Sequence, residues 1–285
     1  MPEQIITAEL RRWIVTQAEA GIRPDTVVAS MVRSGWHEAV ARQALESTMS
    51  ARLDEIAAER AGITEPAGPV PEPDLKHAPN ELMIEGHAIQ VLGTLARPRV
   101  VVFGNLLSHA ECDELVAQAR PRLTRSETVD TATGGSEVNA ARTSDGMFFA
   151  RGESAVIERI ERRISLLLRW PVSHGEGLQV LRYRPGAEYR PHHDYFDPAR
   201  PGTAPVLARG GQRVGTLVMY LAAPDAGGAT IFPDIGFEAA PVKGGAVFFS
   251  YDRPHPSTRT LHGGAPVMAG EKWVATKWLR ERHFE

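Results

Sequence analysis

After Trp170 the chain becomes a succession of short β-rich runs, and this feature restricts its fold more than any other. The runs cover residues 178–183, 213–221, 229–233, 245–251 and 272–279, and clusters of Gly and Pro separate them. Short strands punctuated by turn residues are typical of a β-sandwich or barrel. Upstream, 97–107 predicts a buried strand and 153–170 predicts a helix with one apolar face. Because the helices come first and the strands last, we expect an α+β architecture.

The first sixty residues have a different pattern. Apolar residues at helical spacing predict three short helices, with Thr7 as the first N-cap, Pro24 in the first turn of the second, and the third starting near Trp36. Three short helices make a small core, so we expect this module to support self-association or docking to a partner. A proline-rich stretch, too polar to pack, follows and predicts a semi-rigid linker. The expected domains are a helical module over 1–62, a linker over 63–80 and a second domain over 81–285.

The composition excludes several classes of protein. With 42% hydrophobic residues, 24% charged residues and a net charge of -3, neither a disordered chain nor a broadly basic nucleic-acid-binding surface is expected. Residues 1–20 lack the pattern of a signal peptide, and no long apolar run predicts a membrane span. Cys112 is the one cysteine, which excludes an internal disulfide framework and fits a reducing compartment. We therefore expect a cytoplasmic protein without nucleic-acid or membrane partners, and a buried, inert Cys112.

The stretch "HHD" at residues 192–194 is the first candidate for chemistry. On an extended strand, alternate side chains share a face, so His192 and Asp194 would point together while His193 points away. An imidazole and a carboxylate at this spacing supply two ligands of a metal site. With a second His from elsewhere they would form the 2-His-1-carboxylate triad of non-haem Fe(II) oxygenases.

Two further residues downstream support this interpretation. His262 precedes a Gly-Gly turn in a β-rich segment, and Lys272 lies in a run otherwise suited to burial. A buried cation is costly unless it meets an anion. Lys277 alternates to the opposite face from Lys272, so one of the two lysines should be solvated or paired. Periodicity alone does not choose between them.

Several phrases of the chain together resemble the 2-oxoglutarate-dependent Fe(II) dioxygenases, and in particular the catalytic domain of prolyl 4-hydroxylases. The phrases are "RTSDGMFF", "LQVLRYRPGAEYRPHHDYF", "GGQRVGTLVMYL", "GGATIFP", "KGGAVFFSY" and "TLHGGAPVMAGEKWVATKW". In order and spacing the resemblance covers roughly residues 98–281. It implies a double-stranded β-helix, or jelly roll, with supporting helices on one side.

The resemblance also implies roles for single residues. His192, Asp194 and His262 match iron ligands, and Lys272 matches the residue that pairs with the distal carboxylate of 2-oxoglutarate. The positions that hydrogen-bond this cosubstrate in the family correspond to Tyr183 and Thr230. The positions that line a peptidyl-proline site correspond to Tyr189, Arg213 and Trp278.

Two departures from the family pattern bear on the substrate. Ala229 stands before Thr230 where relatives usually carry glutamate, and Arg280 stands where some carry a histidine near the substrate. The implied reaction is hydroxylation of prolyl residues in a peptide or protein, with Fe(II), 2-oxoglutarate and O2, and with ascorbate as reductant. Hydroxylation of a free amino acid or small natural product, and a non-catalytic binding protein acting through its N-terminal helices, stay open as alternatives.

Other enzyme classes fit the residues less well. An oxidative nucleic-acid demethylase of this type would pair the cosubstrate with arginine, where this chain has Lys272. A halogenase would lack the carboxylate ligand, and a zinc hydrolase would have no use for the lysine. Two Gly- and Pro-rich or polar segments, 125–144 and 197–211, are long enough to be lids, although ordinary loops would have the same composition.

Overall fold

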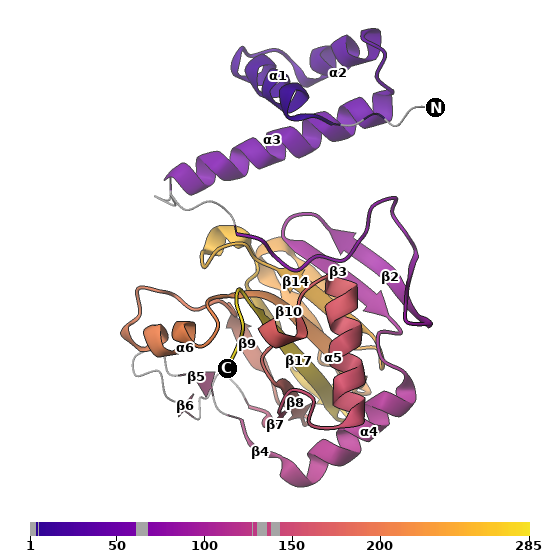
Figure 1. Cartoon of the computed structure of the whole chain (residues 1–285), viewed down its shortest axis with the longest axis vertical. Helices are drawn as coiled ribbons and strands as arrows, with labels where there is room; N and C mark the ends of the chain where they lie inside the picture. The colour runs from indigo at the N-terminus through magenta and orange to yellow at the C-terminus, as the bar shows by residue number, and fades with distance from the viewer. Residues whose placement is uncertain (1–3, 5, 61–67, 127, 130–135, 138–142) are drawn as a thin grey trace. The chain divides into compact units, whose positions relative to one another are not determined.

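The computed structural model describes the chain except for residues 1–3, 5, 61–67, 127, 130–135 and 138–142. It divides into two compact units, Met1–Pro66 and Ala67–Glu285. The first contains only helices, and the second combines helices with β-sheets (Figure 1). None of the described helices is long and apolar enough to cross a membrane.

The N-terminal unit contains the three predicted helices, α1 (Ala8–Glu19), α2 (Pro24–Arg33) and α3 (Glu38–Arg60). The side chain of Thr7 accepts a hydrogen bond from the backbone N–H of Leu10 and caps α1, as expected. The third helix begins at Glu38 rather than at Trp36, because the backbone N–H of Trp36 still bonds to the carbonyl of Met31 and closes α2. Buried side chains from all three helices form one core, made of Ile14, Val27, Val28, Met31, Ala41, Ala44 and Leu45.

The second unit is built on a nine-stranded antiparallel sheet in the order β1-β2-β3-β14-β10-β17-β8-β7-β4. The strands are β1 (Glu81–Ile84), β2 (His87–Leu95), β3 (Arg99–Gly104), β4 (Thr124–Arg125), β7 (Asp145–Phe149), β8 (Leu178–Tyr183), β10 (Arg213–Ala222), β14 (Ala246–Ser250) and β17 (Lys272–Arg280). Four of the predicted runs supply β8, β10, β14 and β17 at its centre. The edge strand β1 and its neighbour β2 were not predicted, because their sequences alternate too weakly to stand out.

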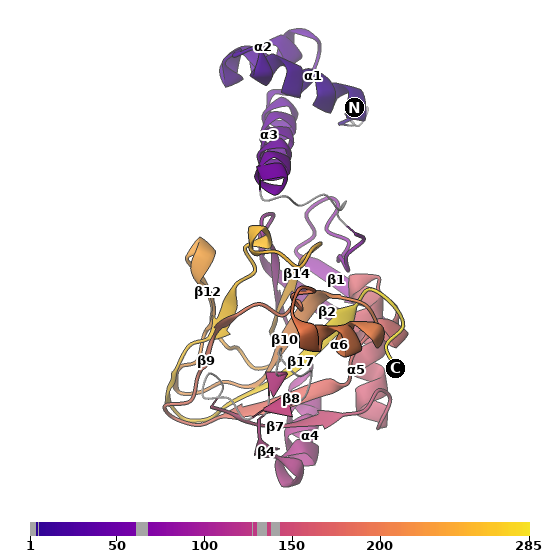
Figure 2. The same cartoon turned by 90° about the vertical axis from the view of Figure 1, so that its left-hand side faces the viewer.

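A smaller sheet has the order β13-β12-β15-β9. Its strands are β9 (Tyr189–His192), β12 (Thr230–Phe232), β13 (Phe237–Ala239) and β15 (His262–Gly264), and two short ladders join β11 (Ala226–Gly227) to β16 (Val267–Ala269) and β5 (Thr128–Val129) to β6 (Ser136–Glu137). Figure 2 shows β9 and β12 on one side of the large sheet and the helices α4 and α5 on the other. Since the chain passes repeatedly between two antiparallel sheets, the fold is the expected double-stranded β-helix.

Helices α4 (His109–Ala119) and α5 (Ala155–Leu168) cover the outer face of the large sheet. A capping box opens α4, in which Ser108 and Glu111 satisfy each other's backbone N–H groups. Strand β10 shows how the sheet separates two cores: Leu217 belongs to the cluster under the helices, whereas Tyr220 belongs to the cluster between the sheets. The remaining helical segments are α6 (Ala204–Ala208), η1 (Arg120–Arg122), η2 (Val172–His174), η3 (Pro201–Thr203), η4 (Pro233–Ile235) and η5 (Pro256–Thr258).

The proline-rich stretch 63–80 differs in part from the expected linker. Pro71 and Pro73 are buried, and Leu75 packs against the core under the helices. The backbone N–H of Glu72 donates to the carbonyl of Leu168, and its carboxylate pairs with Arg99. The expectation that this stretch is too polar to pack is therefore wrong for residues 71–75, because proline rings and one leucine bury enough apolar surface to dock there. The exact domain boundaries stay a prediction.

Candidate active site

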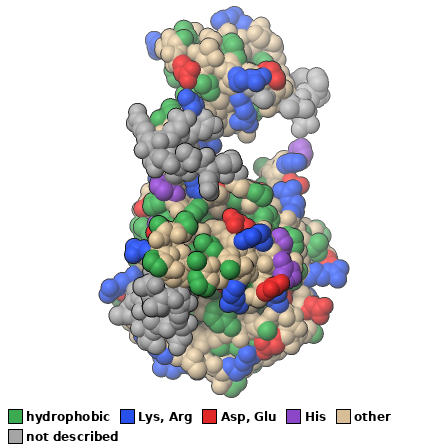
Figure 3. Space-filling model, turned by 60° about the vertical axis from the view of Figure 1, so that its left-hand side comes forward, with side chains coloured by type: hydrophobic (Ala, Val, Ile, Leu, Met, Phe, Trp, Pro, Cys, Tyr) green, Lys and Arg blue, Asp and Glu red, His purple; other side chains and the backbone are tan. Residues whose placement is uncertain are grey.

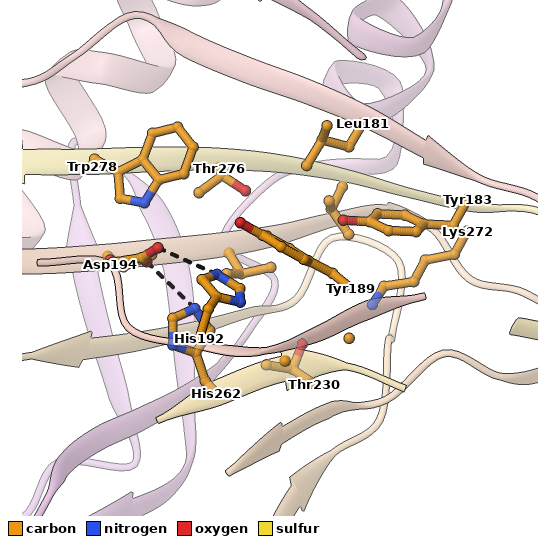
Figure 4. A pocket seen from close by; sticks show the side chains of 15 residues that line it. Leu181, Tyr183, Tyr189, His192, Asp194, Thr230, His262, Lys272, Thr276 and Trp278 are labelled. Carbon is orange, nitrogen blue, oxygen red and sulfur yellow. Dashed lines mark hydrogen bonds and ion pairs between the residues drawn. The ribbon is translucent and has the colours of Figure 1, made fainter. Parts of the chain in front are cut away.

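A pocket between the two sheets collects eight of the nine residues singled out from the sequence. They are Tyr183, Tyr189, His192, Asp194, Thr230, His262, Lys272 and Trp278. Figure 4 shows these side chains directed into one space from strands of both sheets. The ninth, Arg213, does not line the pocket.

His192, Asp194 and His262 converge at one end of the pocket. Strands β9 and β15 pair with His192 opposite His262, which brings together two imidazoles that are distant in the sequence. Nε2 of His192 lies 3.5 Å from Oδ1 of Asp194, and Nε2 of His262 lies 3.4 Å from Oδ2 (Figure 4). The candidate ligand atoms all lie within 4.8 Å of one another. Among the described residues, no other three His, Cys, Asp or Glu side chains are grouped in this way.

The local backbone differs from the extended strand that the sequence suggested. Strand β9 ends at His192, and Asp194 lies in a bend. The Asp194 carboxylate reaches the two imidazoles because the chain turns after His192. The alternation of side chains along an extended strand does not by itself explain why His192 and Asp194 lie together. His193 leaves the site, as expected, and stacks on Tyr195 with ring centroids 4.7 Å apart.

Both imidazoles are held by backbone carbonyls. Nδ1 of His192 lies 2.9 Å from the carbonyl oxygen of Arg190, and Nδ1 of His262 lies 3.0 Å from that of Thr260. Because a carbonyl only accepts, each Nδ1 must carry a proton, and in the neutral ring Nε2 then presents a lone pair. Two such lone pairs face the Asp194 carboxylate. A bound cation would stabilise these lone pairs and the carboxylate oxygens. Without a cation, the electron pairs that face one another repel.

The protonation states in the site agree with such a donor set. Asp194 is 6% exposed; burial alone would raise the pKa of its carboxyl, but His262, His192 and Arg213 hold that pKa well below its usual range. Burial lowers the pKa of His262 to about 4. At neutral pH the site therefore offers an ionised carboxylate and a neutral His262, which are the protonation states that metal coordination requires. The residues present fit a 2-His-1-carboxylate Fe(II) site.

Lys272, at the start of β17, is a buried cation facing the same pocket. Its Nζ lies 5.5 Å from the ring centroid of Tyr183 and 5.8 Å from that of Tyr220, and within the described part of the chain no carboxylate pairs with it. Burial lowers its pKa to about 8. A buried ammonium with no carboxylate partner among the described residues leaves room for an anionic ligand.

Lys277 is the lysine that the fold neutralises. It lies on the helix side of β17, 2% exposed, and its Nζ lies 2.5 Å from a carboxylate oxygen of Glu161 on α5. It also donates to the backbone carbonyl of Glu176. Packing therefore decides which of the two lysines is paired within the protein. Lys277 is paired with Glu161, and Lys272 faces the pocket.

Of the three residues expected at the substrate position, two line the pocket. The ring of Tyr189 stacks on His192 with centroids 3.7 Å apart. Trp278 is 7% exposed, and its indole Nε1 has no hydrogen-bond partner among the described residues. Arg213 instead lies behind Trp278, with its guanidinium 4.0 Å from the indole ring, and Arg213 forms a two-pronged ion pair with Glu176 at 2.7 and 2.8 Å.

Arg280 is also directed away from the pocket. Its guanidinium bonds to Glu176 at 3.0 Å and to the backbone carbonyl of Val206, and the residue is 1% exposed. Glu176 thus binds both arginines, although nothing in its sequence context predicted this role. Tyr220 is a second residue that the sequence did not single out: its hydroxyl donates to Thr230 at 2.7 Å. Alternation along β10 could have identified Tyr220, since it shares a face with the pocket-lining Thr216.

Several residues outside the pocket have structural positions. Trp273 and Phe249 are buried in the core, and Cys112 is fully buried, where burial raises the pKa of its thiol to about 11. Asp197 forms a turn, in which its side chain accepts a hydrogen bond from the backbone N–H of Ala199. The stretch 197–211 contains η3 and α6, whereas most of 125–144 lies outside the described residues. The lid function of both segments stays a prediction.

Comparisons with known proteins agree with this geometry. The family model of the 2OG-Fe(II) oxygenase superfamily matches residues 178–280, which include the triad and Lys272. The chain is 40% identical over 210 residues to Prolyl 4-hydroxylase 5 of Arabidopsis thaliana, covering 66% of this chain and 70% of that protein. It is 43% identical over 202 residues to Prolyl 4-hydroxylase 1 of the same plant, covering 65% and 70%.

Among solved structures, a viral collagen prolyl hydroxylase from Paramecium Bursaria Chlorella virus-1 is similar, with a TM-score of 0.49 and 31% identity over 64% of this chain and 94% of that one. The assignment itself rests on the sequence relatives, which match the chain over most of their length. The chain belongs to the prolyl 4-hydroxylase family of the 2-oxoglutarate- and Fe(II)-dependent oxygenases.

Proposed function

We propose that this protein hydroxylates prolyl residues within a peptide or protein, using Fe(II), 2-oxoglutarate and O2. The observation that carries the proposal is the presence, in one pocket, of the His192–Asp194–His262 triad and the ammonium of Lys272, which has no carboxylate partner among the residues that the structure describes. The identity of 40% or more to two plant proteins named prolyl 4-hydroxylase supports the substrate class.

Each pocket residue has a defined task in this proposal. His192, Asp194 and His262 would hold Fe(II), which couples oxidative decarboxylation of 2-oxoglutarate to oxidation of a C–H bond when it is bound. Lys272 would pair with the distal carboxylate of 2-oxoglutarate in a water-poor environment, where such a charge-assisted bond is strong. Tyr183 and Thr230, which line the pocket with Lys272, would supply hydrogen bonds to the same carboxylate.

The substrate would occupy the side of the pocket lined by Trp278 and Tyr189. The Trp278 ring has a guanidinium on one face, and its Nε1, which has no partner in the described part of the chain, can donate to a peptide carbonyl. Because Arg213 lies behind the indole, we assign it a positioning role rather than direct contact. Stacking of an apolar prolyl ring on an aromatic face suits this site.

Finer features of the proposal concern partners and compartment. We include ascorbate as a reductant, self-association or docking through the N-terminal helices, and a cytoplasmic location consistent with one buried, unpaired cysteine. On the face of the larger unit seen in Figure 3, basic and acidic side chains are interspersed rather than gathered into one basic area. This face therefore lacks the basic area that nucleic-acid binding would use.

The direct test is mass spectrometry of peptides incubated with the purified protein. A proline-containing peptide is expected to gain the mass of one oxygen, with release of succinate, only when Fe(II), 2-oxoglutarate and O2 are all present. The matched peptide with alanine at the proline position should stay unchanged, and so should the reaction containing a chelator. Oxidation of free proline or of a small molecule in cell extract, with no peptide oxidised, would replace the peptide assignment by the small-molecule alternative.

The affinity for 2-oxoglutarate is expected to fall as the pH rises above about 8. Lys272 binds the dicarboxylate as an ammonium, and burial lowers its pKa to about 8, so the free protein loses that charge above this pH. Below the pKa the affinity should be nearly constant, and above it each pH unit should weaken binding roughly tenfold. Isothermal titration of Mn(II)-loaded protein under nitrogen, from pH 7 to 9.5, measures this.

The matched control is Lys272→Arg. A guanidinium stays charged over this range, so its residual affinity should show no such fall. A wild-type affinity that rises or stays flat between pH 8 and 9.5 would contradict the assignment of Lys272 to the cosubstrate.

A further inference from the structure

A chain of two buried hydroxyl groups, the first at the pocket wall, leads to the Asp194 carboxylate. Thr216 lies on β10 and is fully buried, and its Oγ1 donates to Oδ2 of Asp194 at 2.7 Å. Tyr251 follows β14 directly and is 3% exposed, and its hydroxyl lies 3.0 Å from Oγ1 of Thr216. Neither residue has been given a role above.

The chemistry of the Asp194 carboxylate determines which hydroxyl donates in each of these two hydrogen bonds. An ionised carboxylate can only accept, so the one proton of Thr216 is directed to Asp194. Tyr251 must then donate to Thr216. Burial raises the pKa of Tyr251 well above its usual value, so the phenol keeps the proton that this arrangement needs. Tyr251 therefore donates to Thr216, and Thr216 donates to Asp194. We call these two hydroxyl groups the relay.

Both hydroxyls are carried by rigid backbone. In the pairing of β10 with β14, Thr216 stands opposite Phe249, and the backbone N–H of Tyr251 donates to the carbonyl of Val214 at 3.1 Å. The Tyr251 ring packs against the rings of Phe249 and Tyr195, with centroids 6.1 and 6.2 Å away. The large sheet thus sets the position of the hydroxyls, whereas Asp194 itself lies in a bend that follows a short strand.

We propose that Tyr251 and Thr216 are positioning residues that fix the Asp194 carboxylate in the orientation that meets His192 and His262, and thereby set the affinity of the site for its metal. The inference rests on the proposed function, which assigns His192, Asp194 and His262 as the residues that bind the metal. A carboxylate on a bend can rotate about its terminal bond, and one strong bond to Oδ2 removes that freedom. Hydrogen-bond partners of metal ligands commonly set affinity in this way.

Metal affinity tests the relay without depending on turnover. Tyr251→Phe and Thr216→Val each remove one hydroxyl and nearly preserve shape, and Mn(II) affinity is measured by competition with a fluorescent chelator. We expect a loss of roughly 10- to 100-fold for Thr216→Val and a smaller loss for Tyr251→Phe. The double variant should lose less than the product of the two single losses, because both act through one bond to Asp194.

The control is Tyr195→Phe. Tyr195 contacts the Tyr251 ring but makes no hydrogen bond to Asp194, so this variant should bind Mn(II) like the wild type. In turnover assays the relay variants should lower kcat while the KM for 2-oxoglutarate changes little, since Lys272 is untouched.

The possible failures can be told apart. If wild-type protein binds no Mn(II), the metal assignment in the proposed function is wrong and the inference falls with it. If the wild type binds Mn(II) and both relay variants match it within twofold, only the inference is overturned. Variants with a lower melting temperature but unchanged metal affinity would also overturn it, since the hydroxyls would then serve the fold alone.

Discussion

Asp194→Ala is expected to weaken Fe(II) binding by more than about 100-fold and to abolish turnover, since losing a ligand should exceed the effect of losing one of its partners. Asp194 supplies the only carboxylate within reach of both His192 and His262 among the described residues. Without it, two neutral imidazoles would have to hold the ion. Anaerobic equilibrium dialysis with Fe(II) measures the binding, and release of succinate measures the turnover.

The matched control is Asp113→Ala, which removes the same charge at a side chain that is 69% exposed and paired with Lys243. This variant should bind Fe(II) and turn over as the wild type does. Because Arg213, the permanent cation that acts on Asp194, keeps its ion pair with Glu176, the metal-free Asp194→Ala protein should still fold, and its melting curve checks this. Full turnover by Asp194→Ala would show that the ligand assignment is wrong.

Lys272→Met is expected to have two large effects of opposite sign. The first is on the cosubstrate: the distal carboxylate of 2-oxoglutarate would enter the pocket without a counter-charge. Truncating one partner of a buried charge pair typically costs 2–5 kcal/mol, so we expect affinity to fall by roughly 100-fold or more. Isothermal titration under nitrogen measures the affinity, and assays at high 2-oxoglutarate should recover part of the turnover.

The second effect is on stability. The pKa of Lys272 lies at about 8 in the fold against 10.5 ordinarily, so burying its charge costs on the order of 3 kcal/mol at pH 7. Methionine fills the same space without that cost, and the free energy of unfolding of the ligand-free protein should rise by a similar amount. Between pH 8 and 10.5 the unfolded chain binds more protons at this site than the fold does, so wild-type stability gains with pH and the difference should shrink.

Lys277→Met is the matched comparison on the same strand. Lys277 is paired with Glu161, so its removal leaves that buried carboxylate without a counter-charge, held only by the backbone N–H of Gly152 among the hydrogen bonds of the described residues, and should destabilise the fold by about 3–5 kcal/mol. Denaturant unfolding of the two variants should therefore shift in opposite directions. If both variants lost stability alike, Lys272 would be part of an ion pair, and its role as the free ammonium of the pocket would be wrong.

Some features of the site could be predicted from the sequence, and others could not. Once strands are assumed for the runs that form β8, β10 and β17, alternation places Lys272 and Lys277 on opposite faces, but it does not say which face meets the pocket. Pairing of His192 with His262 could not be derived from alternation, because it depends on the register of two short strands far apart in the chain. The resemblance to a known family supplied that pairing instead. For Arg213 the resemblance suggested a position in the substrate site that the structure does not show. Its ion pair with Glu176 holds the guanidinium behind Trp278.

The sequence by itself determined the two-sheet architecture and the kinds of side chain that face the pocket, because binary pattern and residue type are local properties of the chain. The tertiary structure alone decided which charges are satisfied. Glu161 reaches Lys277 from α5, Glu176 binds two arginines, and Thr216 bonds to Asp194 across the gap between sheets. Such pairings depend on where distant segments pack, and the free energy of a buried charge depends on that packing far more than on its neighbours in the chain.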